Sequence, residues 1–203
     1  MAEAKQVFQT SRKQEGVLLA FMGLPGSGKS TTAKALSELI VGSRVFLEPN
    51  ERLWPPAVTG RHRYGYFTAL TWFRSMRIPL LYLADDVRCS GGIAIVDSYY
   101  DKLIAGYLDD PDMRWLMPRD DFYYSIAKGM AELDWAELPD ADCVIFLRVT
   151  VASWRQLLST QMPRHGSGSG VLTQFPYTRT VSGGHVPLCI AVREPGLGLR
   201  SDV

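Results

Sequence analysis

The chain has 203 residues, of which 46% are hydrophobic and 21% charged, the balance of an ordinary globular protein. Its 22 basic and 21 acidic residues give a formal net charge of +1, which argues against a protein that mainly binds nucleic acid or an anionic membrane. No apolar run approaches the length of about 20 residues that a membrane-spanning helix needs. From the net charge and the lack of such a run, we expect neither nucleic-acid nor membrane partners.

The N-terminal segment and the cysteines indicate the cellular compartment in which the protein is expected. Residues 1–15 have neither an apolar core nor a small-residue cleavage site, so we do not expect a secretory signal there. The cysteines Cys89, Cys143 and Cys189 are odd in number and form no CxxC pair. This pattern favours reduced thiols over a disulfide framework or a zinc site. We therefore expect a cytoplasmic protein.

Short apolar runs alternate with helical patterns through the first 160 residues. Buried strands are predicted at 16–22, 44–47, 93–97 and 143–147. Helices are predicted at 29–41, 64–87, 103–108, 120–133 and 153–159. Apolar strands that alternate with helices specify a parallel sheet covered on both faces. The expected fold class is α/β, a three-layer fold with a parallel sheet of four or five strands.

Two interruptions fall inside this pattern. Residues 52–61 are rich in proline and glycine and predict a loop. Pro79 lies within the helical pattern of residues 64–87, and we expect it to kink or end part of that helix because proline lacks a backbone N–H.

The last part of the chain differs in composition. From residue 161 onward, glycine, serine and threonine dominate and the helical periodicity disappears. The apolar run at 186–192 predicts a fifth strand, weakened by Pro187. The composition leaves open a flexible tail or a shortened lid and closing helix. We therefore divide the chain into a polar arm (1–15), a main domain (16–160) and an atypical C-terminal segment (161–203).

The first glycine-rich turn carries the most specific motif. Residues 23–30 read GLPGSGKS and fit G-x-x-x-x-G-K-[ST], between a predicted strand and a predicted helix. This is the P-loop pattern, in which glycines let backbone N–H groups surround a phosphate at a helix N-terminus. The lysine reaches the β- and γ-phosphates and the serine hydroxyl binds Mg²⁺. A plain strand-to-helix turn is the disfavoured alternative. The motif predicts ATP and Mg²⁺ as cofactors, bound by Gly23, Leu24, Pro25, Gly26, Ser27, Gly28, Lys29, Ser30 and Thr31.

Two carboxylates follow predicted strands at the same edge of the sheet. Asp97 ends the run IAIVD, the form of a Walker B strand, and can hold Mg²⁺; its alternative role is a helix cap. Glu48 follows the second strand and can accept a proton from an attacking hydroxyl; its alternative is a surface glutamate before a turn. We expect Lys29, Glu48 and Asp97 to be catalytic, with Ser30 and Asp97 as the metal ligands.

Four segments carry a resemblance to a known family. GLPGSGKSTTAKAL, LEPNERLW, IVDSYYDKLIAGYL and PDADCVIFLRV occur in order over residues 17–158. In these segments the chain resembles the deoxynucleoside kinase and thymidylate kinase group of P-loop phosphotransferases. The resemblance to deoxynucleoside kinases implies that Glu48 is the base and that Trp54 contacts the sugar or base. The thymidylate kinase D-R-Y segment and its downstream alanine match Asp97, Tyr99 and Ala105.

The chain also departs from the family pattern. Ser98 stands where the D-R-Y segment has its arginine, and Arg74 or Arg77 is the candidate substitute. The arginine-rich lid expected after the fourth strand has few arginines. Aromatic residues between positions 54 and 73 can stack on a base or fill the core. Our candidates for substrate contact are Glu48, Trp54, Tyr66, Arg77 and Tyr99.

The resemblance implies an ATP-dependent kinase that transfers the γ-phosphoryl group to a nucleoside or a nucleoside monophosphate. The scarcity of arginines favours a hydroxyl acceptor, and another metabolite or an antibiotic is the alternative substrate class. A nucleotide-binding module with little turnover is a second alternative, and the lack of an N-K-x-D motif disfavours a regulatory GTPase. The expected partner is a small-molecule phosphoryl acceptor, and a homodimer is left open.

Overall fold

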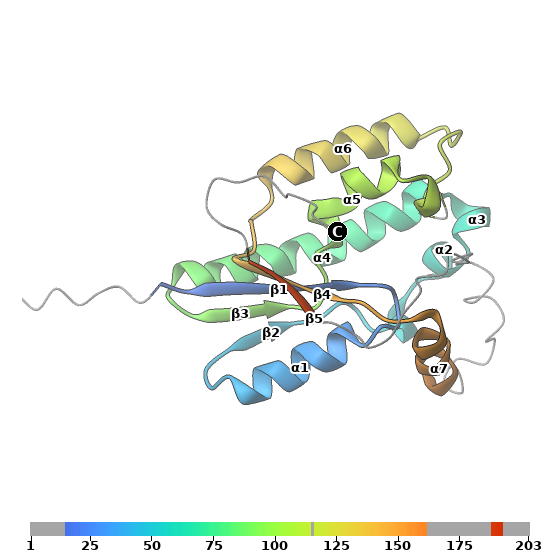
Figure 1. The fold of residues 1–203 in the computed structure, drawn as a ribbon. Helices are drawn as coiled ribbons and strands as arrows, with labels where there is room; N and C mark the ends of the chain where they lie inside the picture. The colour runs from blue at the N-terminus through green and yellow to red at the C-terminus, as the bar shows by residue number, and fades with distance from the viewer. Residues whose placement is uncertain (1–14, 115, 162–187, 193–203) are drawn as a thin grey trace, which may run out of the picture.

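A five-stranded sheet in the order β2-β3-β1-β4-β5 forms the centre of the protein (Figure 1). The computed structural model describes residues 15–114, 116–161 and 188–192. The strands are β1 (Val17–Gly23), β2 (Arg44–Phe46), β3 (Ile93–Val96), β4 (Cys143–Leu147) and β5 (Leu188–Val192). The first four run parallel, as their apolar composition predicts. The polar arm predicted at 1–15 lies almost entirely outside the described residues.

Helices cover both faces of the sheet, which confirms the predicted three-layer α/β fold. Helix α1 lies on one face, and α4, α5 and α6 lie on the other (Figure 1). The helices are α1 (Lys29–Leu39), α2 (Pro56–Thr59), α3 (Arg61–Tyr64), α4 (Tyr66–Cys89), α5 (Tyr100–Asp109), α6 (Tyr124–Glu137) and α7 (Val151–Gln161). Two 3₁₀ turns, η1 (Glu51–Leu53) and η2 (Pro111–Met113), complete the helical elements of the described chain. None of the helices in this part of the chain is long and apolar enough to span a membrane.

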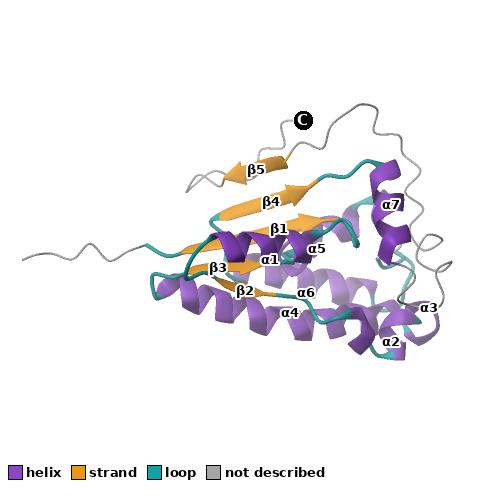
Figure 2. Cartoon of the chain, turned by 90° about the horizontal axis from the view of Figure 1, so that it is seen from below, coloured by secondary structure: helices purple, strands orange, loops and turns teal. Residues whose placement is uncertain are grey.

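The fifth strand forms within the predicted range but pairs antiparallel to β4 (Figure 2). Leu188 lies opposite Leu147, and Val192 lies opposite Cys143. The strand therefore starts at the sheet edge where β4 ends and runs back along it. A strand parallel to β4 would have to start at the end of the sheet where β4 starts, and the chain would need a crossover connection to reach that end. Apart from Gln161, the last residue of the preceding helix α7, the rest of the predicted C-terminal segment lies outside the described residues.

Two local predictions differ from the structure. The segment predicted as a loop at 52–61 contains the last two residues of η1, all of α2 and the start of α3. Pro56 at the first position of α2 favours a helix start, since its fixed φ is helical and no N–H is needed there. Helix α4 continues through Pro79, so the expectation that the proline ends part of the helix is wrong, while the expected kink stays a prediction. Pro79 is exposed, while buried Leu70 and Leu81 on either side of it anchor the helix to the core.

Successive side chains of strand β1 point to opposite faces of the sheet and so pack into two separate core layers. Leu18 and Ala20 pack in the cluster that includes Leu81 of α4. Phe21 packs instead with Ala33 of α1. Because β1 is central and parallel to both neighbours, the loops that follow β1, β2 and β3 meet at one edge of the sheet. This edge carries the residues predicted to be catalytic.

Tyr99 is part of this core rather than of the edge. Its side chain is 6% exposed, and its hydroxyl donates to the Pro139 carbonyl at 3.2 Å. The same hydroxyl accepts the Ala141 N–H at 2.8 Å, which ties the start of α5 to the segment before β4. The side chain therefore satisfies buried backbone groups.

The substitution Tyr99→Phe tests this structural role. We expect it to lower the free energy of unfolding by about 1–3 kcal/mol, because the buried Ala141 N–H loses its acceptor. Urea unfolding followed by circular dichroism measures the change. An unfolding midpoint equal to that of the wild type would contradict the role.

Candidate active site

The P-loop connects β1 to α1 and depends on glycine conformation. Gly23 and Gly28 have φ values of 142° and 93°, a region that other residues rarely adopt. A Cβ on Gly23 would also lie 2.7 Å from the Leu147 carbonyl oxygen. Gly28 is the N-cap of α1, so the first backbone N–H groups of that helix face the loop. This geometry provides an anion-binding site.

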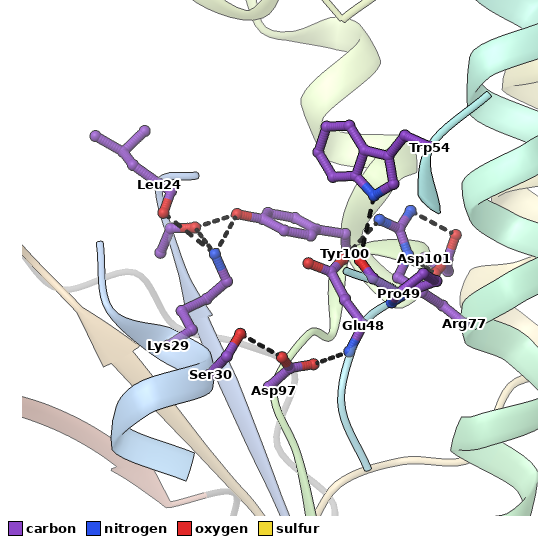
Figure 3. A network of polar contacts seen from close by, with 11 residues as sticks. Leu24, Lys29, Ser30, Glu48, Pro49, Trp54, Arg77, Asp97, Tyr100 and Asp101 are labelled. Atoms are coloured by element: carbon purple, nitrogen blue, oxygen red, sulfur yellow. Dashed lines mark hydrogen bonds and ion pairs between the residues drawn. The ribbon is translucent and has the colours of Figure 1, made fainter. Parts of the chain in front are cut away.

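Lys29 lies inside the loop with its ammonium group surrounded by oxygen atoms (Figure 3). Its Nζ donates to the carbonyl oxygens of Gly23 and Leu24, each at 3.1 Å, and to the Tyr100 hydroxyl at 3.3 Å. The side chain is buried, and burial lowers the pKa of the Lys29 ammonium. The lysine is therefore held at the position from which a P-loop lysine reaches phosphate.

Asp97 joins the P-loop helix to the segment after β2. Its Oδ2 accepts the Ser30 hydroxyl at 2.5 Å, and its Oδ1 accepts the Glu48 N–H at 2.8 Å. Asp97 is 2% exposed, and burial raises the pKa of its carboxyl group. The Ser30 hydroxyl and the Asp97 carboxylate are hard oxygen donors of the kind that Mg²⁺ prefers. The pair therefore fits the predicted metal site, with exposed Ser30 on its solvent side.

Arg77 of α4 connects Glu48 to α5. Its guanidinium group pairs with Asp101 through two hydrogen bonds, at 2.6 and 3.1 Å, and contacts the Glu48 carboxylate at 3.0 Å. Although burial opposes its charge, Asp101 and Glu48 together raise the pKa of Arg77. Arg77 thus remains charged and is shared between two carboxylates. Arg74, the other candidate arginine, instead forms two hydrogen bonds with Asp134 of α6, each at 2.7 Å.

The structure brings three of the five candidate substrate residues to this edge. Glu48, Arg77 and Trp54 lie together in Figure 3, and the Trp54 indole N–H donates to the Pro49 carbonyl at 3.2 Å. Tyr66 packs against the cluster formed by α4, α5 and α6. Tyr99 lies in the core, as described above. The last two side chains are therefore not brought to the network around Glu48.

Sequence reasoning missed three residues of the site. Asp101 holds Arg77, Tyr100 contacts Lys29, and Trp154 of α7 donates its indole N–H to the Pro25 carbonyl of the P-loop at 2.8 Å. The sequence gives only a weak indication that Trp154 belongs to the site, because the residue lies far from the P-loop along the chain. Its helix begins at a Thr150 N-cap, whose hydroxyl accepts the Ser153 N–H at 3.1 Å.

A small cavity lies beside the network. Glu48, Arg77, Asp97 and Ser98 line its polar side, and its apolar lining is Phe46, Leu80, Leu81 and Val96. The Ser98 hydroxyl is buried without a hydrogen-bond partner. Ser98, the residue found where the family pattern has arginine, therefore adds no positive charge to this side of the site.

Comparison with known proteins gives similarities to solved structures alone, since no family model and no curated protein matches the chain. One similar structure is thymidylate kinase from Candida albicans, with 24% sequence identity and a TM-score of 0.48, covering 70% of this chain and 67% of that one. Another is thymidylate kinase from Ehrlichia chaffeensis, with 21% identity and a TM-score of 0.41, covering 70% and 76%.

The substitution Trp154→Phe tests whether α7 positions the P-loop. Removing the indole N–H frees the Pro25 carbonyl, so we expect the Kd for Mg²⁺-ADP to rise about three- to tenfold. Isothermal titration calorimetry measures the affinity. Tyr99→Phe is the matched control, because it removes a buried hydrogen bond away from the P-loop. Equal losses of affinity in the two variants would assign the effect to general destabilisation.

Proposed function

We propose that the chain is an ATP-dependent kinase that transfers the γ-phosphoryl group to a hydroxyl group of a small acceptor of the nucleoside class. The observation that carries this proposal is the position of Asp97, which accepts hydrogen bonds from both Ser30 and Glu48. A P-loop with a metal-type ligand pair thus lies directly beside a candidate base, the Glu48 carboxylate. Binding modules need the first of these features, whereas a phosphotransferase needs both.

The P-loop side of the site provides the groups that would bind the nucleotide. Backbone N–H groups at the start of α1 bind phosphate oxygens, and Lys29 neutralises charge on the transferred group. Ser30 and Asp97 would hold Mg²⁺, which when bound offsets the charge of the β- and γ-phosphates. Phosphoryl transfer has a loose transition state, so positioning and electrostatics provide most of the catalysis.

The acceptor side favours a hydroxyl compound without a phosphate group. Glu48 can take the hydroxyl proton or hold the hydroxyl in line with the γ-phosphate. Arg77 contributes positive charge here, but it already pairs with two carboxylates, those of Asp101 and Glu48. A phosphomonoester would enter a region where carboxylates outnumber the paired guanidinium group. We therefore prefer a nucleoside over a nucleoside monophosphate, with another hydroxyl metabolite or an antibiotic as the alternative.

A second candidate function is a nucleotide-binding module with little turnover. The observation that favours it is the ion pair between Glu48 and Arg77 at 3.0 Å, which holds the candidate base away from an acceptor. A kinase must release this pair or operate with it in place. Measurement of ADP production from ATP, with and without nucleosides, nucleoside monophosphates and other hydroxyl compounds, separates the two functions. ADP production that depends on an acceptor and is lost in Lys29→Ala supports the kinase. If ATP binds but no acceptor increases ADP production, the module is favoured.

The substitution Glu48→Gln tests the assignment of the base. For the best acceptor in that panel we expect kcat to fall by at least about 100-fold, since a positioned general base contributes 10²–10⁴-fold. The Kd for ATP should stay close to the wild-type value, because Glu48 lies on the acceptor side. Glu51→Gln, at an exposed glutamate in the following turn, is the matched control and should retain full activity. A Glu48→Gln enzyme with wild-type kcat would show that another group accepts the proton.

A further inference from the structure

Tyr100 spans the two halves of the candidate site (Figure 3). Its backbone starts α5 beside Arg77, whose guanidinium carbon lies 5.6 Å from the centre of the tyrosine ring. Its hydroxyl reaches the P-loop, where it donates to the Gly23 carbonyl and accepts from Lys29. The ring therefore lies between the groups that would bind the acceptor and those that would bind the nucleotide.

The contacts of Lys29 leave its ammonium group fully occupied by protein atoms. An ammonium group has three N–H donors, and here the acceptors are the carbonyls of Gly23 and Leu24 and the hydroxyl of Tyr100. A phosphate oxygen can approach Lys29 only if at least one of these contacts is released. The two carbonyls belong to the loop itself, whereas Tyr100 belongs to α5, and rotation of its side chain alone would remove its hydroxyl from Lys29.

Tyr100 also covers one side of the Lys29 ammonium group. The Lys29 Nζ lies 5.2 Å from the centre of the tyrosine ring, so the ring and hydroxyl cover one side of the ammonium group. Burial, together with the charge of Glu48, raises the pKa of the Tyr100 phenol. The phenol is therefore neutral and cannot replace the charge of a phosphate as a partner for the lysine.

We propose that Tyr100 is an autoinhibitory contact, whose hydroxyl competes with the nucleotide phosphates for Lys29 and must leave before the nucleotide binds fully. This inference rests on the nucleotide site of the proposed function and adds a regulatory step to it. The same side chain contacts Lys29 on the nucleotide side and Arg77 on the acceptor side.

The substitution Tyr100→Phe tests the proposal, because it removes the hydroxyl and keeps the ring. We expect the Kd for Mg²⁺-ADP to fall about three- to tenfold, the net effect of one competing hydrogen bond. Tighter binding is the informative sign, since a merely structural loss would weaken binding. Tyr124→Phe is the matched control: its hydroxyl donates to the Leu108 carbonyl at 2.6 Å, between α6 and α5. Its Kd should equal that of the wild type.

The variant Lys29→Ala separates failure of this proposal from failure of the proposed function. If Lys29→Ala loses ADP binding while Tyr100→Phe binds ADP as the wild type does, or more weakly, the nucleotide site stands and the autoinhibitory contact is refuted. If Lys29→Ala binds ADP with wild-type affinity, the nucleotide site itself is wrong and both proposals fail. Tighter binding by both Tyr100→Phe and Tyr124→Phe would also refute a specific contact.

Discussion

The buried carboxylate of Asp97 is the group on which the arrangement of the site depends. A carboxylate that is 2% exposed needs hydrogen-bond donors, because burial of an unpaired charge is costly. The donors are the Ser30 hydroxyl at the start of α1 and the Glu48 N–H after β2. The parallel sheet brings the start of α1 and the segment after β2 to the same edge, and the Asp97 side chain then fixes their positions relative to each other. The P-loop and the candidate base take their relative positions from this contact.

Around that contact, charge is distributed unequally between the two halves of the site. On the P-loop side, the N-terminus of α1 and Lys29 present positive character suited to phosphate. On the other side, the carboxylates of Asp101 and Glu48 outnumber the single guanidinium group of Arg77, so this half carries an excess of negative charge. Tyr100 lies between the halves and contacts both. The proposed phosphoryl transfer and the proposed control of access to Lys29 both rest on this geometry.

The sequence predicts the parts of the site that local pattern controls. The P-loop requires glycine conformations and a following helix, and both are visible in eight consecutive residues. Contacts between segments that are far apart in the sequence are harder to predict. Arg74 and Arg77 lie one helical turn apart on α4, and only the packing of α6 and α5 pairs the first with Asp134 and the second with Asp101. The direction of β5 was likewise not predictable, because an apolar run has the same pattern in parallel and antiparallel strands.

The fate of the γ-phosphorus of ATP tests the proposed reaction most directly. Phosphorus NMR of the full chain with Mg²⁺-ATP and a mixture of nucleosides follows this atom without a coupling enzyme. The arrangement of Lys29, Asp97 and Glu48 predicts that ADP accumulates together with a new phosphate monoester on an acceptor hydroxyl. Recovery of the γ-phosphorus only as ATP or as inorganic phosphate, across the whole mixture, would contradict phosphoryl transfer to a nucleoside hydroxyl.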